Sequence, residues 1–285
     1  KPQQARRAQR KHIAVKRCVR RGYTNILKNF VLIGAAGYIA PRHMQAIKET
    51  GNNLIAALDK HDSVGILDSY FPEADFFTEF ERFDRHCEKL RRSGTAIHYV
   101  SVCSPNYLHD AHCRFGLRIG ADVICEKPVV LNPWNVDALM EMEKETGKKV
   151  FTVLQLRHHP AVIALKERIE KAGAGKKYQV ELKYITPRGR WYYHSWKGDM
   201  DKSGGIASNI GIHFFDLLLW FFGAVKKNVV TEHTASMASG QLELERADVN
   251  WMLSTETAGV QEQKSHRSLR IDGENIDFNN GMDRQ

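Results

Sequence analysis

The chain has 285 residues, of which 42% are hydrophobic and 26% are charged, an ordinary balance for a soluble globular protein. Its longest apolar stretches, such as residues 214–222, are far shorter than the ~20 residues that cross a bilayer. No apolar signal core follows the basic N-terminus. These features argue against an integral membrane or secreted protein and predict a cytoplasmic chain of two domains, without membrane insertion.

The net charge of +9 is concentrated at the N-terminus. Residues 1–28 contain ten Lys or Arg and no Asp or Glu, so the remainder of the chain is close to neutral. A surface that reads nucleic acid carries its basic residues on a folded face, whereas these precede the first predicted strand. We therefore expect no nucleic-acid partner. The basic arm is interpreted as a solvated, disordered extension, with a phosphate-binding or membrane-surface role as the alternative.

The five cysteines are odd in number and form no C-x-x-C pair, which predicts reduced, structural thiols. His109, His112 and Cys113 are close in the sequence, but a zinc site needs four ligands and no second cluster completes them. The sequence therefore predicts no metal site.

In the first half of the chain, short apolar runs alternate with helical patterns. Strands are predicted at residues 29–33, 54–58, 97–103, 122–125 and 150–155. Helices are predicted between them at residues 38–50, 79–93, 106–119 and 134–146. This alternation is typical of a doubly wound parallel sheet with binding loops at the carboxyl ends of its strands. Residues 29–155 are therefore predicted to form a Rossmann-type α/β domain.

The pattern changes after residue 155. A helix at 161–172 and a very apolar helix at 210–222 are combined with alternating stretches at 178–185, 227–233, 242–253 and 268–272. Period-two alternation indicates strands with one solvated face. Residues 156–285 are therefore predicted to be an α+β domain with a mainly antiparallel, open-faced sheet that binds substrate and forms oligomers.

The first predicted strand ends in the turn Gly-Ala-Ala-Gly-Tyr-Ile-Ala. Gly34 permits a tight turn, Gly37 leaves room where backbone meets a pyrophosphate, and the helix N-terminus offers N–H groups and a positive dipole end. Such a glycine pattern alone is weak evidence for a nucleotide site, and Ala36 stands where a glycine is more usual. Because the pattern lies between a strand and a helix, it predicts a dinucleotide site that also includes Tyr38 and Ile39.

Asp59 ends the second predicted strand, 25 residues after Gly34. A carboxylate at this point accepts hydrogen bonds from the ribose hydroxyls of adenosine and repels a 2′-phosphate, which favours NAD over NADP. The alternative is that Asp59 only caps a turn. Asp62, in the same loop, is a second candidate.

Further motifs follow the third and fourth predicted strands and lie in the second half of the chain. They are Ser104-Pro105-Asn106 with His109, Glu126-Lys127-Pro128, Gly204-Gly205, and Asn209-Ile210-Gly211-Ile212-His213. In this order they resemble the motifs of the Gfo/Idh/MocA oxidoreductase family, over residues 28–281. Within that family the chain is most similar to WlbA/WbpB-type UDP-N-acetylglucosaminuronate 3-dehydrogenases of bacterial surface-polysaccharide (O-antigen) synthesis.

The resemblance implies NAD as the cofactor, a sugar nucleotide as the substrate and a homo-oligomer, a tetramer, as the assembly. It also implies that the turn at Ser104, Pro105 and Asn106 lies beside the dinucleotide together with His109. Glu126 and Lys127 would lie where nicotinamide meets sugar, next to a peptide bond that is cis in many relatives. Relatives usually continue beyond the point where this chain ends, so the C-terminal domain is expected to be shortened.

His213 and Lys127 are the predicted catalytic residues. Asn209, His213 and Asp216 recur at i, i+4 and i+7, a polar stripe on an apolar helix that suggests a cleft. Hydride transfer from a sugar carbon requires a base for the hydroxyl proton, and imidazole is suited to this near neutral pH. We assign the base to His213 and stabilisation of the alkoxide to Lys127, although the two roles are exchangeable. Without the resemblance, a buried core histidine and a surface lysine are the simpler interpretations.

Basic and aromatic residues are predicted to bind the substrate. Guanidinium groups bind carboxylate and phosphate, and aromatic faces stack on sugar or uracil rings. The predicted contacts are Arg157, Arg188, Tyr192, Trp196 and Asn209, with Lys127 and His213, while Gln155 is assigned to the cofactor. The alternative is a polar hairpin loop at residues 188–197 whose aromatic side chains pack on their own sheet.

The sequence thus predicts an NAD-dependent sugar dehydrogenase. A dehydrogenase of the same family that acts on a simpler sugar or on inositol is one alternative. A sensor that binds NAD without turnover is another, because a fold alone does not decide function.

Overall fold

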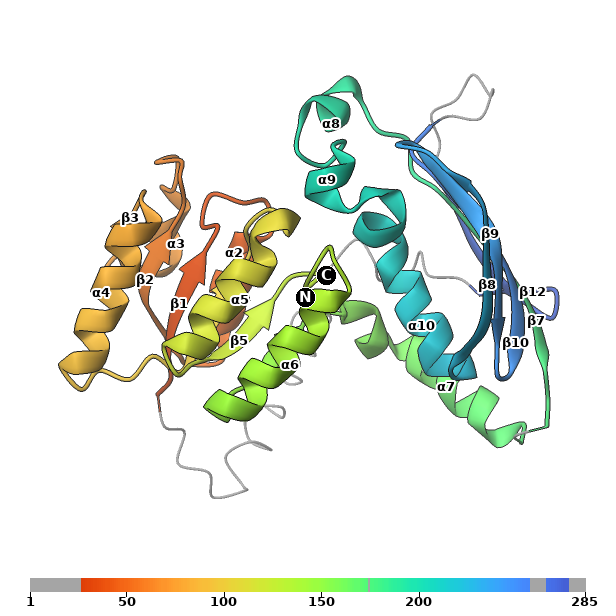
Figure 1. Cartoon of the computed structure of the whole chain (residues 1–285), viewed down its shortest axis with the longest axis horizontal. Coiled ribbons are helices and arrows are strands. Elements are labelled where there is room, and N and C mark those ends of the chain that lie inside the picture. The colour runs from red at the N-terminus through yellow and green to blue at the C-terminus, as the bar shows by residue number, and fades with distance from the viewer. Residues whose placement is uncertain (1–26, 174, 257–264, 277–285) are drawn as a thin grey trace, which may run out of the picture.

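The computed structural model describes residues 27–173, 175–256 and 265–276, which form two lobes, each built on a six-stranded sheet (Figure 1). Most of the basic arm, Cys18 and residues 277–285 lie outside the described residues. In the first lobe the strand order is β3-β2-β1-β4-β5-β6 and every pair is parallel. The strands are β1 (Asn29–Ile33), β2 (Asn53–Leu58), β3 (Asp75–Phe77), β4 (Tyr99–Val102), β5 (Asp122–Cys125) and β6 (Val150–Thr152). The prediction of a doubly wound parallel sheet is confirmed.

Helices cover both faces of this sheet, because its central strands are apolar on both sides. Val31 and Leu32, neighbours on β1, are both fully buried and belong to different core clusters, one on each face. The helices are α2 (Ala40–Glu49), α3 (Ile66–Tyr70), α4 (Phe80–Arg92), α5 (His109–Arg118) and α6 (Trp134–Thr146), with a 3₁₀ turn η1 (Asn106–Leu108) before α5. The short elements α3 and β3 were not predicted, since neither is long enough to show a period.

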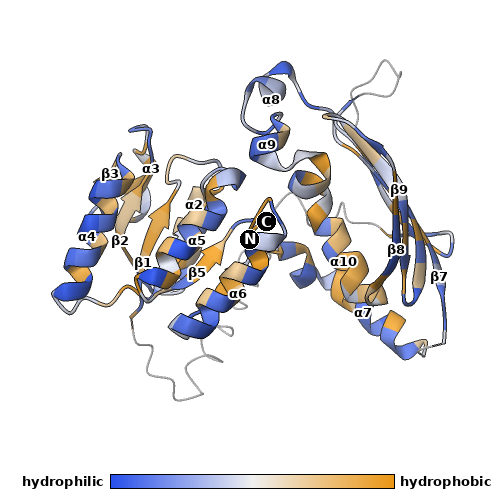
Figure 2. Cartoon of the chain, in the orientation of Figure 1, coloured by the Kyte–Doolittle hydropathy of each residue, from blue (hydrophilic) through white to orange (hydrophobic). Residues whose placement is uncertain are grey.

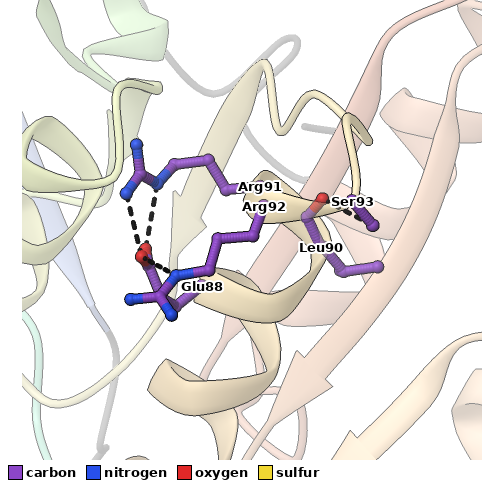
Figure 3. A network of polar contacts seen from close by, with 5 residues as sticks. All are labelled: Glu88, Leu90, Arg91, Arg92 and Ser93. Carbon is purple, nitrogen blue, oxygen red and sulfur yellow. Dashed lines mark hydrogen bonds and ion pairs between the residues drawn. The ribbon is translucent and has the colours of Figure 1, made fainter.

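The C-terminal end of α4 carries a small polar network on the surface (Figure 3). Glu88 accepts hydrogen bonds from both Arg91 and Arg92, and these contacts lower the pKa of its carboxyl to about 2. The Ser93 hydroxyl donates to the Leu90 carbonyl at 2.8 Å, which satisfies an acceptor in the last turn. Exposed ion pairs of this kind add little to stability.

Four of the five cysteines lie in the first lobe, and all four are buried free thiols: Cys87, Cys103, Cys113 and Cys125. Burial raises the pKa of the Cys87 thiol to about 12 and that of Cys103 and Cys125 well above the usual value. The prediction of reduced structural thiols is confirmed for these four. Within the described part of the chain, no group of three His, Cys, Asp or Glu side chains is placed to hold a metal ion.

The second lobe packs helices on one face of a mixed sheet ordered β12-β11-β7-β10-β9-β8. Among the strands that the structure describes in this lobe, only β7 and β10 pair in parallel, so the predicted α+β architecture is confirmed. The strands are β7 (Tyr178–Ile185), β8 (Val225–His233), β9 (Met237–Leu244), β10 (Ala247–Ser254), β11 (His266–Ile271) and β12 (Glu274–Ile276). The helical elements are η2 (Gln155–His158), α7 (Pro160–Lys171), α8 (Arg190–His194), α9 (Met200–Ser203), the π-helical turn η3 (Ala207–Gly211) and α10 (Ile212–Phe222).

The apolar helix α10 forms the core of the second lobe. Leu217, Leu218, Phe221 and Phe222 are almost fully buried, and Figure 2 shows hydrophobic residues along α10 and α7, with hydrophilic residues prominent on β8 and β9. The helical stretch Met200–Phe222 has 23 residues, and an 18-residue window within it has a mean hydropathy of 1.4, so by length and composition alone it is long and apolar enough to cross a membrane. Half of that window is buried within the protein, as in a core helix of a globular domain.

Candidate active site

A cavity of about 2520 Å³ is lined by residues from both lobes. The carboxyl ends of β1, β2, β4 and β5 face it from the first lobe, and residues from 184 to 214 face it from the second. Most of the predicted site residues line it: Gly34, Ala36, Gly37, Tyr38, Ile39, Asp59, Ser104, Pro105, Asn106, His109, Glu126, Lys127, Gln155, Arg188, Tyr192, Trp196, Asn209 and His213. Asp62 and Arg157 are not among the lining residues.

The turn after β1 is closely packed against the turn after β4. Gly34 has a φ of +92°, and a Cβ at this position would lie 2.6 Å from the backbone carbon of Cys103 and the nitrogen of Ser104. A side chain is therefore excluded both by conformation and by space. Two loops that face the cavity are held together at this glycine.

We predict that Gly34→Ala destabilises the protein by about 3 kcal/mol, because backbone strain and a backbone clash add to each other. Gly51→Ala is the matched control, since Gly51 also has a positive φ, +74°, but a Cβ added there would have no atom within 4 Å. Urea unfolding of both variants measures the difference. Equal losses of stability in the two variants would show that the close approach at Gly34 carries no energy.

Asp59 links the turn after β1 to the loop after β2. Its Oδ2 accepts from the Ala36 N–H and its Oδ1 from the His61 N–H, each at 2.9 Å. The carboxylate therefore caps its own loop, as the simpler interpretation held, and it also lines the cavity. A carboxylate has about four acceptor positions, so two remain for ribose hydroxyls.

We predict that Asp59→Ala weakens NAD binding about 10-fold or more, the usual effect of losing hydrogen bonds to a charged group. Asp62→Ala is the control, because Asp62 lies in the same loop but does not line the cavity. Isothermal titration of NAD into both variants measures the effect. A larger loss of affinity in the Asp62 variant would reverse the assignment of the ribose-binding carboxylate.

His109 joins the turn after β4 to the turn after β5. The side chain is 1% exposed, with Nδ1 at 2.7 Å from the Pro128 carbonyl and Nε2 at 2.7 Å from the Ser104 carbonyl. Burial lowers the pKa of His109, while the two carbonyls and Glu126 oppose that effect. Both ring nitrogens are engaged by protein, so His109 has the contacts of a residue that positions these turns.

Lys127 extends from the turn after β5 to the second lobe. Its Nζ donates to the Asn209 carbonyl at 2.6 Å, and the Lys127–Pro128 peptide bond is cis, as the resemblance implied. Burial is the main cause that lowers the pKa of Lys127; the charges of Lys197 and Arg188 add to this effect and Glu126 opposes it. The positive charge of the Lys127 ammonium is therefore less well compensated than the charge of a solvent-exposed lysine.

Glu126 has a partner that the sequence did not predict. His43 Nε2 lies 3.0 Å from Glu126 Oε1, and His43 Nδ1 lies 2.7 Å from the Ser101 hydroxyl. Burial, the largest single effect, raises the pKa of Glu126, but the contact with His43 and the charges of His43 and Lys127 together outweigh it, so the pKa is lowered. The sequence contained one indication of this pairing: His43 is a polar residue on the apolar side of α2, next to the buried Met44.

His213 lies on the first turn of α10, facing the cavity and close enough to Lys127 to be affected by its charge. Burial, and then the charge of Lys127, lower the pKa of His213 to about 4. Its Nδ1 is buried and has no hydrogen-bond partner among the described residues. The expectation that the pKa of His213 lies near neutrality is therefore wrong for the free protein. At physiological pH the His213 imidazole is neutral and is able to accept a proton.

The polar stripe predicted on the apolar helix is only partly present. Asn209 lies in the π-helical turn η3 rather than in the α-helix, and Asp216 does not line the cavity. Asp216 instead accepts from Arg157 Nε at 2.8 Å, and the Arg157 guanidinium lies over the Trp220 ring at 5.4 Å. The structure thus does not bring Arg157 to the cavity, because Asp216 and Trp220 hold it on α10.

The loop at residues 188–197 contains the short helix α8 and presents cations and aromatic rings to the cavity. Arg188 lies over the Tyr192 ring at 5.7 Å, and Lys197 lies near the Trp191 and Trp196 rings at 5.4 and 5.7 Å. Tyr192 is 4% exposed, and its hydroxyl accepts from Asn209 Nδ2 at 3.2 Å. Lys197 also lines the cavity; it is the last residue of the loop 188–197 predicted to bind substrate, although it was not named individually as a contact.

Models of one oxidoreductase family match both lobes. Residues 28–154 match its NAD-binding Rossmann fold, and residues 166–283 match its C-terminal α/β domain. The chain belongs to the Gfo/Idh/MocA family. Its first lobe is accordingly the NAD-binding Rossmann fold of that family, and NAD is its cofactor.

Solved structures of other family members are also similar. The WlbA (WbpB) dehydrogenase from Thermus thermophilus in complex with NAD and α-ketoglutarate is 48% identical, with a TM-score of 0.86 over 90% of this chain and 84% of that one. The same enzyme with NAD and UDP-GlcNAcA is 49% identical, with a TM-score of 0.84 over 88% and 83%.

Curated relatives are more distant. The putative oxidoreductase YteT of Bacillus subtilis is 27% identical over 203 residues, which are 69% of this chain and 47% of YteT. D-glucoside 3-dehydrogenase of Escherichia coli is 26% identical over 135 residues, 47% of this chain and 38% of that enzyme. The matches thus span about half of these relatives' length or less.

Proposed function

We propose that the protein oxidises a sugar hydroxyl with NAD and that its substrate is UDP-N-acetylglucosaminuronic acid, oxidised at C3. The observation that carries this proposal is that Lys127 and His213, from different lobes, line one cavity together with the glycine turn and Asp59. The similarity to the Thermus thermophilus WlbA dehydrogenase, whose crystals contain NAD and UDP-GlcNAcA, supports the choice of substrate.

The cavity fits a dinucleotide and a second ligand. Pockets for one drug-sized molecule are ~300–1,000 Å³, whereas this one measures about 2520 Å³. Gly34 leaves no side chain at the turn, and Asp59 has free acceptor positions next to it. The residues proposed to hold NAD are therefore the turn from Gly34 to Ile39, Asp59 and the turn from Ser104 to Asn106. NAD, when bound, supplies the nicotinamide C4 that accepts hydride.

His213 is proposed to remove the hydroxyl proton. As the C–H bond breaks and its electron pair leaves with the hydride, the O–H proton moves to a neutral imidazole nitrogen and a C=O bond forms. His213 is neutral in the free protein, because its pKa is about 4. Lys127 donates a charged hydrogen bond to the oxygen while negative charge develops on it.

The charge of the cavity supports an anionic substrate. Arg188 and Lys197 both act to lower the pKa of Lys127, and Arg188 also lowers that of Lys197. Three cations that disfavour one another leave an excess of positive charge, which a carboxylate or diphosphate relieves. A neutral sugar or inositol offers no such relief.

Rapid mixing of the protein with NAD and UDP-N-acetylglucosaminuronate tests the proposal. We expect NADH absorbance to appear, and to be absent with myo-inositol. Tight NAD binding without NADH formation, from any of these compounds, would overturn the dehydrogenase proposal and favour the NAD sensor.

We further propose that the enzyme is cytoplasmic, does not insert into membranes, serves O-antigen synthesis and forms a homotetramer, with a domain boundary at residues 155–156. The exposed apolar side chains Val225, Val229 and Val230 on β8 support self-association. Light scattering of the purified protein measures the assembly.

A further inference from the structure

Asn209 connects the cofactor lobe to the substrate loop. Its carbonyl accepts from Lys127 Nζ at 2.6 Å, and its side-chain Oδ1 accepts from Asn106 Nδ2 at 3.4 Å. Its own Nδ2 donates to the Tyr192 hydroxyl at 3.2 Å. Asn106 also donates to the Ser203 carbonyl at 2.9 Å, so this part of the interface between the lobes is hydrogen-bonded on both sides.

The backbone around Asn209 brings these groups together. Asn209 occupies the middle of the π-helical turn η3, between Ala207 and Gly211. A π turn is a local irregularity that is frequent at functional sites. In this position the Asn209 carbonyl accepts a hydrogen bond from Lys127. The Asn209 side chain forms hydrogen bonds with Asn106 and Tyr192.

The side chain at this junction is a neutral amide, while the Lys127 ammonium contacts the backbone carbonyl of the same residue. The charges that act on Lys127 are the anion Glu126 and the cations Lys197 and Arg188, so positive charge is in excess. Aspartate would fit the same space: its oxygens accept from Asn106 Nδ2 and from the Tyr192 hydroxyl, which is able to act as donor. The geometry therefore permits a carboxylate, and the amide leaves the positive charge uncompensated.

We propose that Asn209 is a specificity-determining residue, whose neutral amide keeps the cavity positive beside Lys127 so that the acidic group of the substrate provides the missing counter-charge. This inference rests on the proposed function and identifies what makes the site select an acidic sugar over a neutral one. Asn209 acts on the substrate through the charge around Lys127 and not by removing a proton.

The test is Asn209→Asp, with Asn209→Leu as a control that removes the side-chain hydrogen bonds to Asn106 and Tyr192 without adding a charge. Binding of UDP-N-acetylglucosaminuronate and of UDP-N-acetylglucosamine is measured by calorimetry in the presence of NAD. These two nucleotides differ at C6, where one carries a carboxylate. Aspartate is expected to lower the preference for the acid over the neutral nucleotide ~10-fold or more. The Leu variant is expected to bind both nucleotides more weakly and to leave the ratio of the two affinities within about 2-fold of the wild-type ratio.

A ratio unchanged by aspartate, in a variant with wild-type circular dichroism, overturns the inference, and so does an equal change in the Leu variant. If the wild type binds neither nucleotide, the proposed function fails, and the pH dependence of Lys127 labelling by dinitrofluorobenzene still tests Asn209. Glu126, Lys197, Arg188 and His213 surround that lysine in both proteins. Aspartate is expected to move the midpoint of labelling to higher pH; an unmoved midpoint overturns the role of Asn209.

Discussion

Replacement of Lys127 by Met is expected to reduce kcat by ~10²–10³-fold, the usual effect of removing one group that stabilises developing negative charge. The aliphatic part of Met retains the packing, while the hydrogen bond to the Asn209 carbonyl and the charge next to His213 are lost. NAD affinity should change little, because the residues proposed to hold NAD are Asp59, the turn from Gly34 to Ile39 and the turn from Ser104 to Asn106. Steady-state kinetics and NAD titration measure both quantities.

Lys89→Met is the matched control, since Lys89 is exposed on α4 and does not line the cavity. It should retain wild-type kcat. Near-wild-type turnover in the Lys127 variant would show that this lysine does not contribute to catalysis.

Replacement of His213 by Gln is expected to reduce kcat by ~10²–10⁴-fold, the range typical of a lost general base. Glutamine preserves a polar side chain in the cavity but cannot accept the proton. His213 has a pKa lowered to about 4, so it is neutral and able to accept above that pH and is lost as a base only below it. Wild-type kcat/KM should therefore be flat from weakly acidic to weakly alkaline pH.

The same pH profile separates the two possible assignments of the base. If Lys127 removed the proton, it would have to be neutral, and kcat/KM would rise through the alkaline range toward the pKa of that lysine, which burial lowers from 10.5. If kcat/KM rises in this way and still rises in the His213→Gln variant, Lys127 is the base and His213 is not. A flat wild-type profile with a strong loss in the variant agrees with His213 as the base.

The sequence predicts most of the first lobe because its central strands are continuous apolar runs and its longer helices have regular hydrophobic patterns. Continuous apolar strands such as β1 and β5, and the amphipathic helices between them, appear at their predicted places. The three-residue strand β3 and the five-residue helix α3 show no period. The strand predicted at residues 150–155 is shorter than predicted: β6 ends at Thr152, and residues from Gln155 form the 3₁₀ turn η2. Local pattern is informative only over several turns or pleats.

The errors in the predicted site have physical reasons. The stripe through Asn209, His213 and Asp216 assumed 3.6 residues per turn, whereas the π turn at Asn209 shifts the phase of the residues that follow it. Arg157 was assigned to the substrate from its charge, but a partner 59 residues away, Asp216, binds it. The pairing of His43 with Glu126 spans 83 residues and is set by the sheet order, which no local pattern contains.

The central claim is that Lys127 and His213 face the same sugar hydroxyl beside the nicotinamide ring. A crystal structure of the protein with NAD and UDP-N-acetylglucosaminuronate tests it most directly. The account predicts that the Lys127 ammonium and a His213 ring nitrogen both lie within hydrogen-bond distance of the C3 hydroxyl, with the C3 hydrogen directed at nicotinamide C4. A sugar bound with its C3 hydroxyl out of reach of either nitrogen would contradict it.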